Sequence, residues 1–153
     1  MQHLDAGPRD DRGLALHLPP VFILVHLWFH FRRRVPMVAA SNSRPVREWV
    51  TWEDGFLIHG VGLCLDPRRR APIGFASDAF GEALAKRLIA TPDTVRFLRR
   101  HRSAPSFLPS PYGRTIRLGQ SDLRLLPAGG LPGAAQLELR YRGATVLYAR
   151  RIL

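Results

Sequence analysis

Apolar and polar residues alternate most regularly near the C-terminal end of the chain. Between residues 136 and 141, leucines and a tyrosine alternate with charged side chains. This period of two is typical of a strand with one buried face. We predict this strand and a second one over residues 144–149. Arg142 and Gly143 lie between them, a connection of the length that β-hairpins favour.

Shorter apolar runs bounded by glycine, proline or aspartate predict further strands. These segments are residues 56–58, 62–65, 72–76, 115–118 and 122–126. The first two are expected to form a small hairpin around Gly60 and Gly62. Asp66 and Pro67 close the second strand, because an aspartate before proline favours a turn. Residues 103–112 are rich in serine and proline and are predicted to be a loop.

A first helix is predicted after the strand at 72–76. Ser77 or Asp78 can cap it, because either side chain can accept hydrogen bonds from the free N–H groups of a first turn. We expect this helix to run to about Leu88. Residues 88–90 are interpreted either as its end or as a fourth strand.

A second helix is predicted to start at Thr91. The order Thr91-Pro92-Asp93 supplies a cap, a proline at the first helical position and an acid in the first turn. The helix is expected to end in the basic residues 99–102. Positive charges stabilise a helix C-terminus, so this cluster has a structural explanation as well as a functional one.

The N-terminal segment differs from the rest of the chain. Residues 14–31 are apolar but are interrupted by Pro19 and Pro20, and three arginines follow them. A membrane-spanning helix needs ~20 apolar residues, and a signal peptide carries its positive charge before the apolar run. We rank three interpretations. The preferred interpretation is that residues 1–36 are an extension of the reading frame without selected structure. A membrane-associated helix ranks second and a signal peptide last. Residues 37–153 form the domain.

Charge and cysteine content limit the possible partners, cross-links and cellular compartment of the protein. The 153 residues carry a formal net charge of +11, and Lys86 is the only lysine among 23 basic residues. Arginine-rich composition is also usual for GC-rich genomes, so only local clusters indicate binding. Cys64 is the single cysteine, which excludes an internal disulfide and a cysteine-based zinc cluster. It favours a reducing compartment, and we expect a cytoplasmic protein, with membrane association through residues 14–31 as the alternative.

The order of the predicted elements resembles the N-terminal half of a metallo-β-lactamase-fold domain. More narrowly, it resembles the nucleic-acid exonuclease branch, which includes the RNA-processing and ligase-associated enzymes. The pieces that carry the resemblance are GLCLDPRRRAPIGFAS (62–77), ATPDTVRFL (90–98), PYGRTIRLGQSDLRLLPAGG (111–130), LPGAAQLEL (131–139) and RGATVLYARR (142–151). It covers about residues 52–153. The resemblance implies an α/β (α+β) fold, half of an αββα sandwich, with a mixed β-sheet of short strands and two helices on one face.

The same resemblance implies where metal ligands would stand. The family carries His-x-His-x-Asp-His after its third strand, where this chain has Asp78, Phe80, Glu82 and Ala83. A further family histidine corresponds to Gly130. The position of the bridging aspartate, after the final strand, holds Arg150-Arg151.

These replacements remove the expected two-metal site, which requires several histidine and carboxylate ligands. Asp78 and Glu82, four apart on the predicted helix, could hold one weakly bound hard cation. We expect no cofactor, with zinc as the alternative. We also predict that Arg150 or Arg151 forms a salt bridge with Asp78 or Glu82 in place of the metal.

Three functions follow from these expectations. The first is a catalytically silent module that binds nucleic acid or a protein partner covering the exposed face of its sheet. The predicted nucleic-acid-binding residues are Arg68, Arg69, Arg70, Arg96, Arg99, Arg100 and Arg102. The second is an active metal-dependent hydrolase that cleaves phosphodiesters and uses a non-standard site or a half supplied by another chain. The third is a truncated gene product without function.

Overall fold

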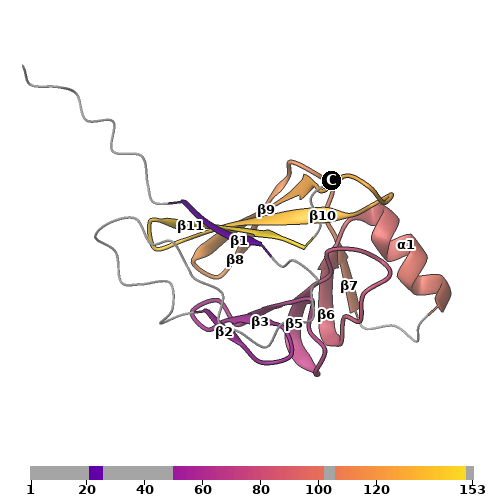
Figure 1. Cartoon of the computed structure of the whole chain (residues 1–153), viewed down its shortest axis with the longest axis horizontal. Helices are drawn as coiled ribbons and strands as arrows, with labels where there is room; N and C mark the ends of the chain where they lie inside the picture. Colours follow the sequence, from indigo (N-terminus) through magenta and orange to yellow (C-terminus); the bar gives the residue numbers. More distant parts are fainter. Residues whose placement is uncertain (1–20, 26–49, 102–105, 151–153) are drawn as a thin grey trace, which may run out of the picture.

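Two β-sheets face each other in the computed structural model of this chain, and one helix lies at the end of the lower sheet (Figure 1). The structure describes residues 21–25, 50–101 and 106–150. Within these ranges the fold is mixed α/β and consists mostly of short strands.

Sheet A has five strands in the order β1-β11-β10-β9-β8. They are β1 (Val21–Val25), β8 (Thr115–Leu118), β9 (Ser121–Pro127), β10 (Ala135–Tyr141) and β11 (Ala144–Ala149). Strands β8 to β11 are antiparallel neighbours, and β1 runs parallel to β11. The predicted C-terminal hairpin is confirmed. Arg142 and Gly143 form its turn with φ angles of 48° and 76°, the left-handed pair that a tight hairpin turn requires.

Sheet B has six strands in sequential order. They are β2 (Val50–Trp52), β3 (Phe56–Ile58), β4 (Leu63–Leu65), β5 (Ala71–Phe75), β6 (Ala85–Ala90) and β7 (Ser106–Pro109). The pairs β2–β3 and β3–β4 are antiparallel, whereas β4 to β7 are parallel. The predicted hairpin around Gly60 and Gly62 is therefore confirmed as β3 and β4.

The helix α1 (Pro92–His101) connects β6 to β7. It begins as predicted, since the Thr91 side-chain oxygen accepts a hydrogen bond from the Thr94 N–H at 3.3 Å. Its buried residues Val95 and Leu98 pack with Leu88 of β6. Ile89, the next residue of β6, instead joins the cluster between the sheets. The helix thus packs on the β6–β7 end of the face of sheet B that points away from sheet A.

Thr91 also ties α1 to the loop before β10. Its hydroxyl donates to the Gly133 carbonyl oxygen at 2.6 Å, and Thr91 is 1% exposed. We expect Thr91→Ala to lower the free energy of unfolding by about 1–2 kcal/mol, because it removes the cap and leaves a buried carbonyl with one bond fewer. Urea denaturation would measure this loss. Thr91→Ser keeps the hydroxyl and is the matched control; an equal loss in both variants would contradict the role of the hydroxyl.

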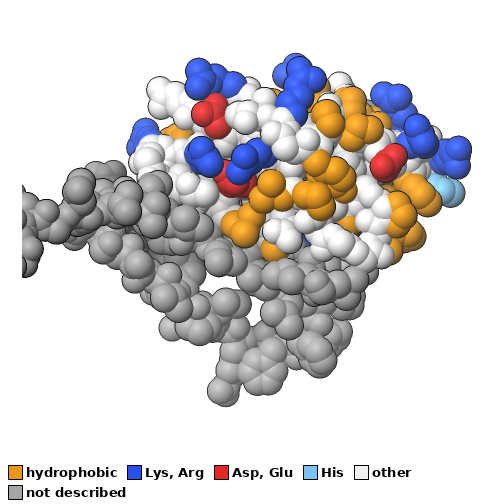
Figure 2. All heavy atoms as spheres, turned by 90° about the horizontal axis from the view of Figure 1, so that it is seen from above, with side chains coloured by type: hydrophobic (Ala, Val, Ile, Leu, Met, Phe, Trp, Pro, Cys, Tyr) orange, Lys and Arg blue, Asp and Glu red, His pale blue; other side chains and the backbone are white. Residues whose placement is uncertain are grey.

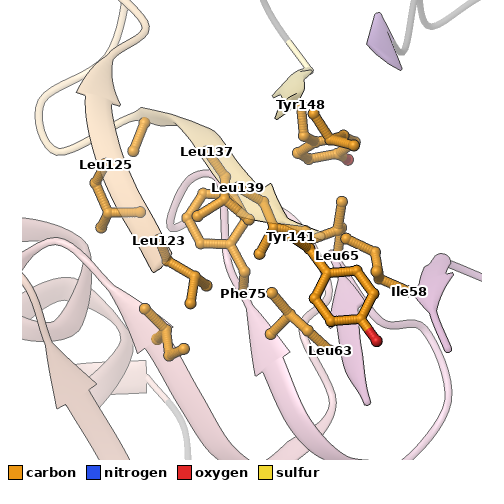
Figure 3. Close-up of a cluster of buried hydrophobic side chains, with 13 residues drawn as sticks. Ile58, Leu63, Leu65, Phe75, Leu123, Leu125, Leu137, Leu139, Tyr141 and Tyr148 are labelled. Atoms are coloured by element: carbon orange, nitrogen blue, oxygen red, sulfur yellow. The ribbon is translucent and has the colours of Figure 1, made fainter. Parts of the chain in front are cut away.

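The main core fills the space between the sheets (Figure 3). Leucines at alternate positions of β9 and β10 point toward side chains of β4 and β5. Leu139, Leu65 and Phe75 are each 0% exposed. The opposite face of sheet A carries charged side chains, and Glu138 there pairs with Arg124 at 2.7 Å and with Arg140 at 2.8 Å. Such a charged face is typical of a surface in contact with water.

Three predictions about the fold are wrong. The first helix is absent: the segment after β5 forms turns and then strand β6, so the described residues contain one helix rather than two. The predicted loop at 103–112 contains strand β7. The single mixed sheet is replaced by two sheets. Of the two interpretations of residues 88–90, the strand is correct.

The apolar N-terminal segment is described only over β1. Residues 21–25 form a strand paired with β11, whereas the membrane-associated interpretation expected a helix there. The extension interpretation stays a prediction. The remainder of residues 1–36 lies outside the described residues. In the described part of the chain, no helix has the length and apolar character needed to cross a membrane.

Candidate functional site

A cavity of about 320 Å³ opens where β4, β11 and the turns after β5 meet. Its walls include the charged side chains Asp66, Arg68, Glu82 and Arg150. Its lining also includes the aromatic side chains Trp52, Phe80 and Tyr148. Trp52 and Phe80 are 51% and 65% exposed, respectively. The cavity thus combines two arginines and two acids with exposed aromatic rings.

Asp66 is the centre of a hydrogen-bond network beneath this cavity. One carboxylate oxygen accepts the Ser77 N–H at 2.8 Å. The other accepts the Ser77 hydroxyl at 2.6 Å and the Tyr148 hydroxyl at 2.8 Å. Asp66 follows β4 and Ser77 follows β5, while Tyr148 belongs to β11. The network therefore joins sheet B to sheet A.

Burial governs the ionisation of this network. It raises the pKa of Asp66 above its ordinary value of 3.8, although the bonds from Ser77 and the positive charge of Arg150 act in the opposite direction. Burial and the nearby Asp66 carboxylate also raise the pKa of Tyr148. The Tyr148 hydroxyl consequently keeps its proton and acts as a donor to Asp66.

Arg150 lies between two carboxylates. Its Nη1 atom is 3.7 Å from Asp78 Oδ2 and 3.9 Å from Asp66 Oδ2. This atom is buried and makes no hydrogen bond in the described part of the chain, so its interaction with the two acids is electrostatic. The predicted ion pair is therefore present between Arg150 and Asp78. Arg151 lies outside the described residues.

A tight turn holds Asp78 and leaves space for the guanidinium of Arg150. Asp78 Oδ1 accepts the N–H groups of Phe80 and Gly81, both at 2.8 Å. A Cβ atom at Gly81 would overlap the guanidinium of Arg150. Arg150 can therefore approach Asp78 only because residue 81 is a glycine. The hydrogen bonds from the backbone to Asp78 fix the direction of the turn.

The positions that the resemblance aligns with metal ligands do not gather as a ligand set. Asp78 is buried in its turn, whereas Phe80 and Glu82 are exposed. Ala83 is buried in the core beneath α1, and Gly130 is exposed in the loop before β10. The expectation that Asp78 and Glu82 share one face of a helix is wrong, because no helix forms there. No cluster of three histidine, cysteine or acidic side chains suited to a metal occurs among the described residues.

The predicted arginines fall into two exposed groups. In the turn after β4, Arg68 lines the cavity and Arg69 pairs with Asp54 at 2.6 Å, while Arg70 is exposed. On α1, Arg96, Arg99 and Arg100 are all exposed. The guanidinium of Arg99 lies 5.7 Å from the centre of the Phe107 ring. Arg102 lies outside the described residues.

Aromatic side chains connect the cavity to the helix. Phe80 lines the cavity, and its ring centre is 5.9 Å from that of Phe97 on α1. Phe97 in turn lies 6.3 Å from the His101 ring. The basic helix and the cavity therefore border a common surface. On the face seen in Figure 2, exposed hydrophobic side chains likewise lie between groups of basic ones.

Sequence reasoning missed the Asp66 network and this aromatic row. Asp66 was interpreted only as the start of a turn, and Tyr148 only as part of a strand. The available signal was an aspartate at the end of an apolar strand, because such positions lie at the edge of a sheet, where sites form. Phe80 was noted only for the histidine that it replaces.

Comparison with models of known protein families and with curated proteins found no match for this chain. The similarity to metallo-β-lactamase domains therefore stays a prediction from the sequence.

Proposed function

We propose that this chain is a catalytically silent, metallo-β-lactamase-like module that binds nucleic acid. The observation that carries the proposal is the position of Arg150, whose guanidinium lies within 4 Å of both Asp66 and Asp78 beside the cavity. Asp78 is the first of the positions that the resemblance aligns with metal ligands. A positive side chain takes the place of a positive ion.

The arrangement of layers supports the finer part of this proposal. Two sheets enclose the main core, and α1 packs on the β6–β7 end of the outer face of sheet B. This order of helix, sheet and sheet corresponds to three layers of an αββα sandwich. The turn that holds Asp78 follows β5 directly, where the family places its metal-binding motif.

The donor set at this position does not fit zinc. Asp78 Oδ1 already accepts two N–H groups, and both Asp66 oxygens accept hydrogen bonds. The fixed charge of Arg150 repels a cation, and the described surroundings supply no histidine. We expect the purified full chain to contain far less than one zinc ion per molecule when measured by elemental analysis. Stoichiometric zinc, with phosphodiesterase activity, would support the active-hydrolase alternative instead.

Nucleic acid is favoured over a protein that covers a sheet. The outer face of sheet A carries ion pairs, among them Arg124–Glu138 and Arg117–Asp122, so a docked sheet or helix would have to cover charged groups there. The cavity and α1 instead expose arginines next to aromatic rings. Proteins that bind nucleic-acid backbones use this combination.

We expect binding to a labelled oligonucleotide to weaken steeply with salt. If four exposed arginines neutralise phosphates, the association constant should fall about fifty- to a hundred-and-fiftyfold between 50 and 200 mM salt. Fluorescence anisotropy would measure this slope. Replacing Arg68 and Arg70 by alanine should make the salt dependence of binding less steep. Replacing Arg117 and Arg140, which lie on the outer face of sheet A, should leave it unchanged. Absent or salt-independent binding would overturn the proposal.

A further inference from the structure

The row Phe80, Phe97 and His101 forms an aromatic surface beside the basic helix. Phe80 is 65% exposed and Phe97 is 42% exposed. The Phe80 and Phe97 rings are tilted by 46°, and Phe97 and His101 by 30°. Tilted rings at these distances touch without covering each other, so part of each ring surface remains open. Two large exposed rings in contact call for a partner with flat apolar faces.

This surface is held in place before any ligand arrives. The backbone N–H of Phe80 is bonded to the Asp78 carboxylate, which is itself 4% exposed. Phe97 projects from α1, whose buried residues Val95 and Leu98 fix the helix on sheet B. Rings on rigid supports lose little conformational entropy when a ligand stacks on them.

Positive charge flanks the aromatic row on the helix side. Arg96 and Arg100 lie four residues apart and therefore on one face of α1, next to the face of Phe97 and His101. Arg99 is turned toward the Phe107 ring instead. Asp93 lies in the first turn of the helix. The positive charge is thus concentrated toward the C-terminal end of α1, where a phosphate would be attracted.

We infer that this surface binds single-stranded nucleic acid, with bases stacked on Phe80 and Phe97 and phosphates paired with Arg96 and Arg100. The inference rests on the proposed function and specifies the form of nucleic acid. In a duplex the bases are already stacked on one another and their faces are not accessible. In a single strand the faces are free, and stacking on aromatic side chains tolerates any sequence.

The test compares oligonucleotide binding by the full chain and two phenylalanine variants. The probe is a fluorescent single strand of about 12 thymidines, and a duplex of the same length is the comparison. We expect the single strand to bind more tightly. Phe80→Ala and Phe97→Ala should each weaken its binding about five- to a hundred-and-sixtyfold, the range measured for loss of a stacking ring, and should leave duplex binding unchanged.

Matched controls separate stacking from loss of apolar area or of structure. Leu108→Ala removes an apolar side chain of 44% exposure from β7 and should leave binding unchanged. Phe80→Tyr and Phe97→Tyr keep the ring and should retain binding, and a thermal melt of each variant checks that it is folded. Arg100→Ala should weaken binding more than Arg99→Ala.

The outcomes distinguish this inference from the proposed function. Salt-dependent binding that is equal for duplex and single strand, and is unaffected by the phenylalanine variants, would overturn stacking and leave nucleic-acid binding in place. If neither form of nucleic acid binds, both are overturned. Loss of binding in the alanine variants but not in the tyrosine variants would establish the rings as the base-binding surface.

Discussion

Replacing Arg150 by methionine is expected to lower the free energy of unfolding by about 3–5 kcal/mol at neutral pH. The guanidinium is the cation nearest to both Asp66 and Asp78 in the described structure, and the three side chains are 4–13% exposed. Without it, Asp66 and Asp78 would remain buried and would lose the positive charge that lies within 4 Å of both. Methionine keeps most of the volume, so the loss reports the charge. Urea denaturation of both proteins would measure it.

The effect of this substitution should depend on pH. Asp66 has a raised pKa in the folded protein, so folding takes up a proton between its ordinary value of 3.8 and the raised one. Stability from this group consequently falls as the pH increases through that window. Arg150 opposes the shift, and its removal should enlarge it. The loss caused by Arg150→Met is therefore expected to be greatest above the window and to shrink as the pH falls toward 3.8.

Arg140→Met is the matched control, because Arg140 is 61% exposed and pairs with Glu138 on the outer face of sheet A. Its loss should be within about 1 kcal/mol, the range for exposed ion pairs. Equal losses in the two variants would show that Arg150 contributes no more than a surface pair. A variant that also carries Asp78→Asn should regain part of the stability, since one buried charge is then removed.

Phe75→Ala is the second substitution with a large expected effect, a loss of about 3–5 kcal/mol in the free energy of unfolding. Phe75 is 0% exposed, and its ring meets the edge of the Tyr148 ring at a centre distance of 6.2 Å. Alanine would leave a cavity between the sheets and remove the support of Tyr148, which donates to Asp66. Urea denaturation would measure the loss. A decrease in oligonucleotide binding at temperatures where the variant is folded would show that the surface cavity lined by Tyr148 has changed.

Phe75→Leu tests the volume argument for this position. Leucine fills most of the space, so its loss should be clearly smaller, about 1–2 kcal/mol. If alanine and leucine destabilise the protein equally, the ring contact with Tyr148, rather than the filled volume, determines the contribution of Phe75.

Strands with a local pattern were predictable from the sequence. The hairpin of β10 and β11 follows from alternation and from two turn residues, and both signals are contained in fourteen consecutive residues, 136–149. The start of α1 was equally local, because Thr91, Pro92 and Asp93 each favour the same boundary. Agreement among neighbouring signals made these elements predictable.

The segment after β5 was mispredicted for a physical reason. Asp78 does accept two backbone N–H groups, as a helix cap would, but the same bonds close a turn that does not continue as a helix. Residues 85–90 then pair with β5 and β7 on either side. Pairing with two strands outweighs the weak helix preference of alanine, lysine and leucine. Strand β7 was missed because the prolines in and around it indicated a loop, although Pro109 is tolerated at a sheet edge.

The candidate site was only partly predictable. The Arg150–Asp78 ion pair could be predicted because the resemblance aligns both residues with metal-ligand positions of that family. The hydrogen bond from Tyr148 to Asp66 joins residues 82 positions apart in the sequence, and no local pattern predicts a contact between such distant residues. The contact between Phe80 and Phe97 likewise depends on how the turn after β5 lies against α1.

Strand β1 has a consequence for the first 36 residues. It occupies the side of β11 that β10 leaves free, with Val21 to Val25 matched to Thr145 to Ala149. A polypeptide initiated at Met37 would lack it and would present a bare row of β11 amide and carbonyl groups. Such a row recruits the nearest extended segment, including one from a second molecule. In the full chain, β1 pairs with this edge of β11 and so prevents self-association through it.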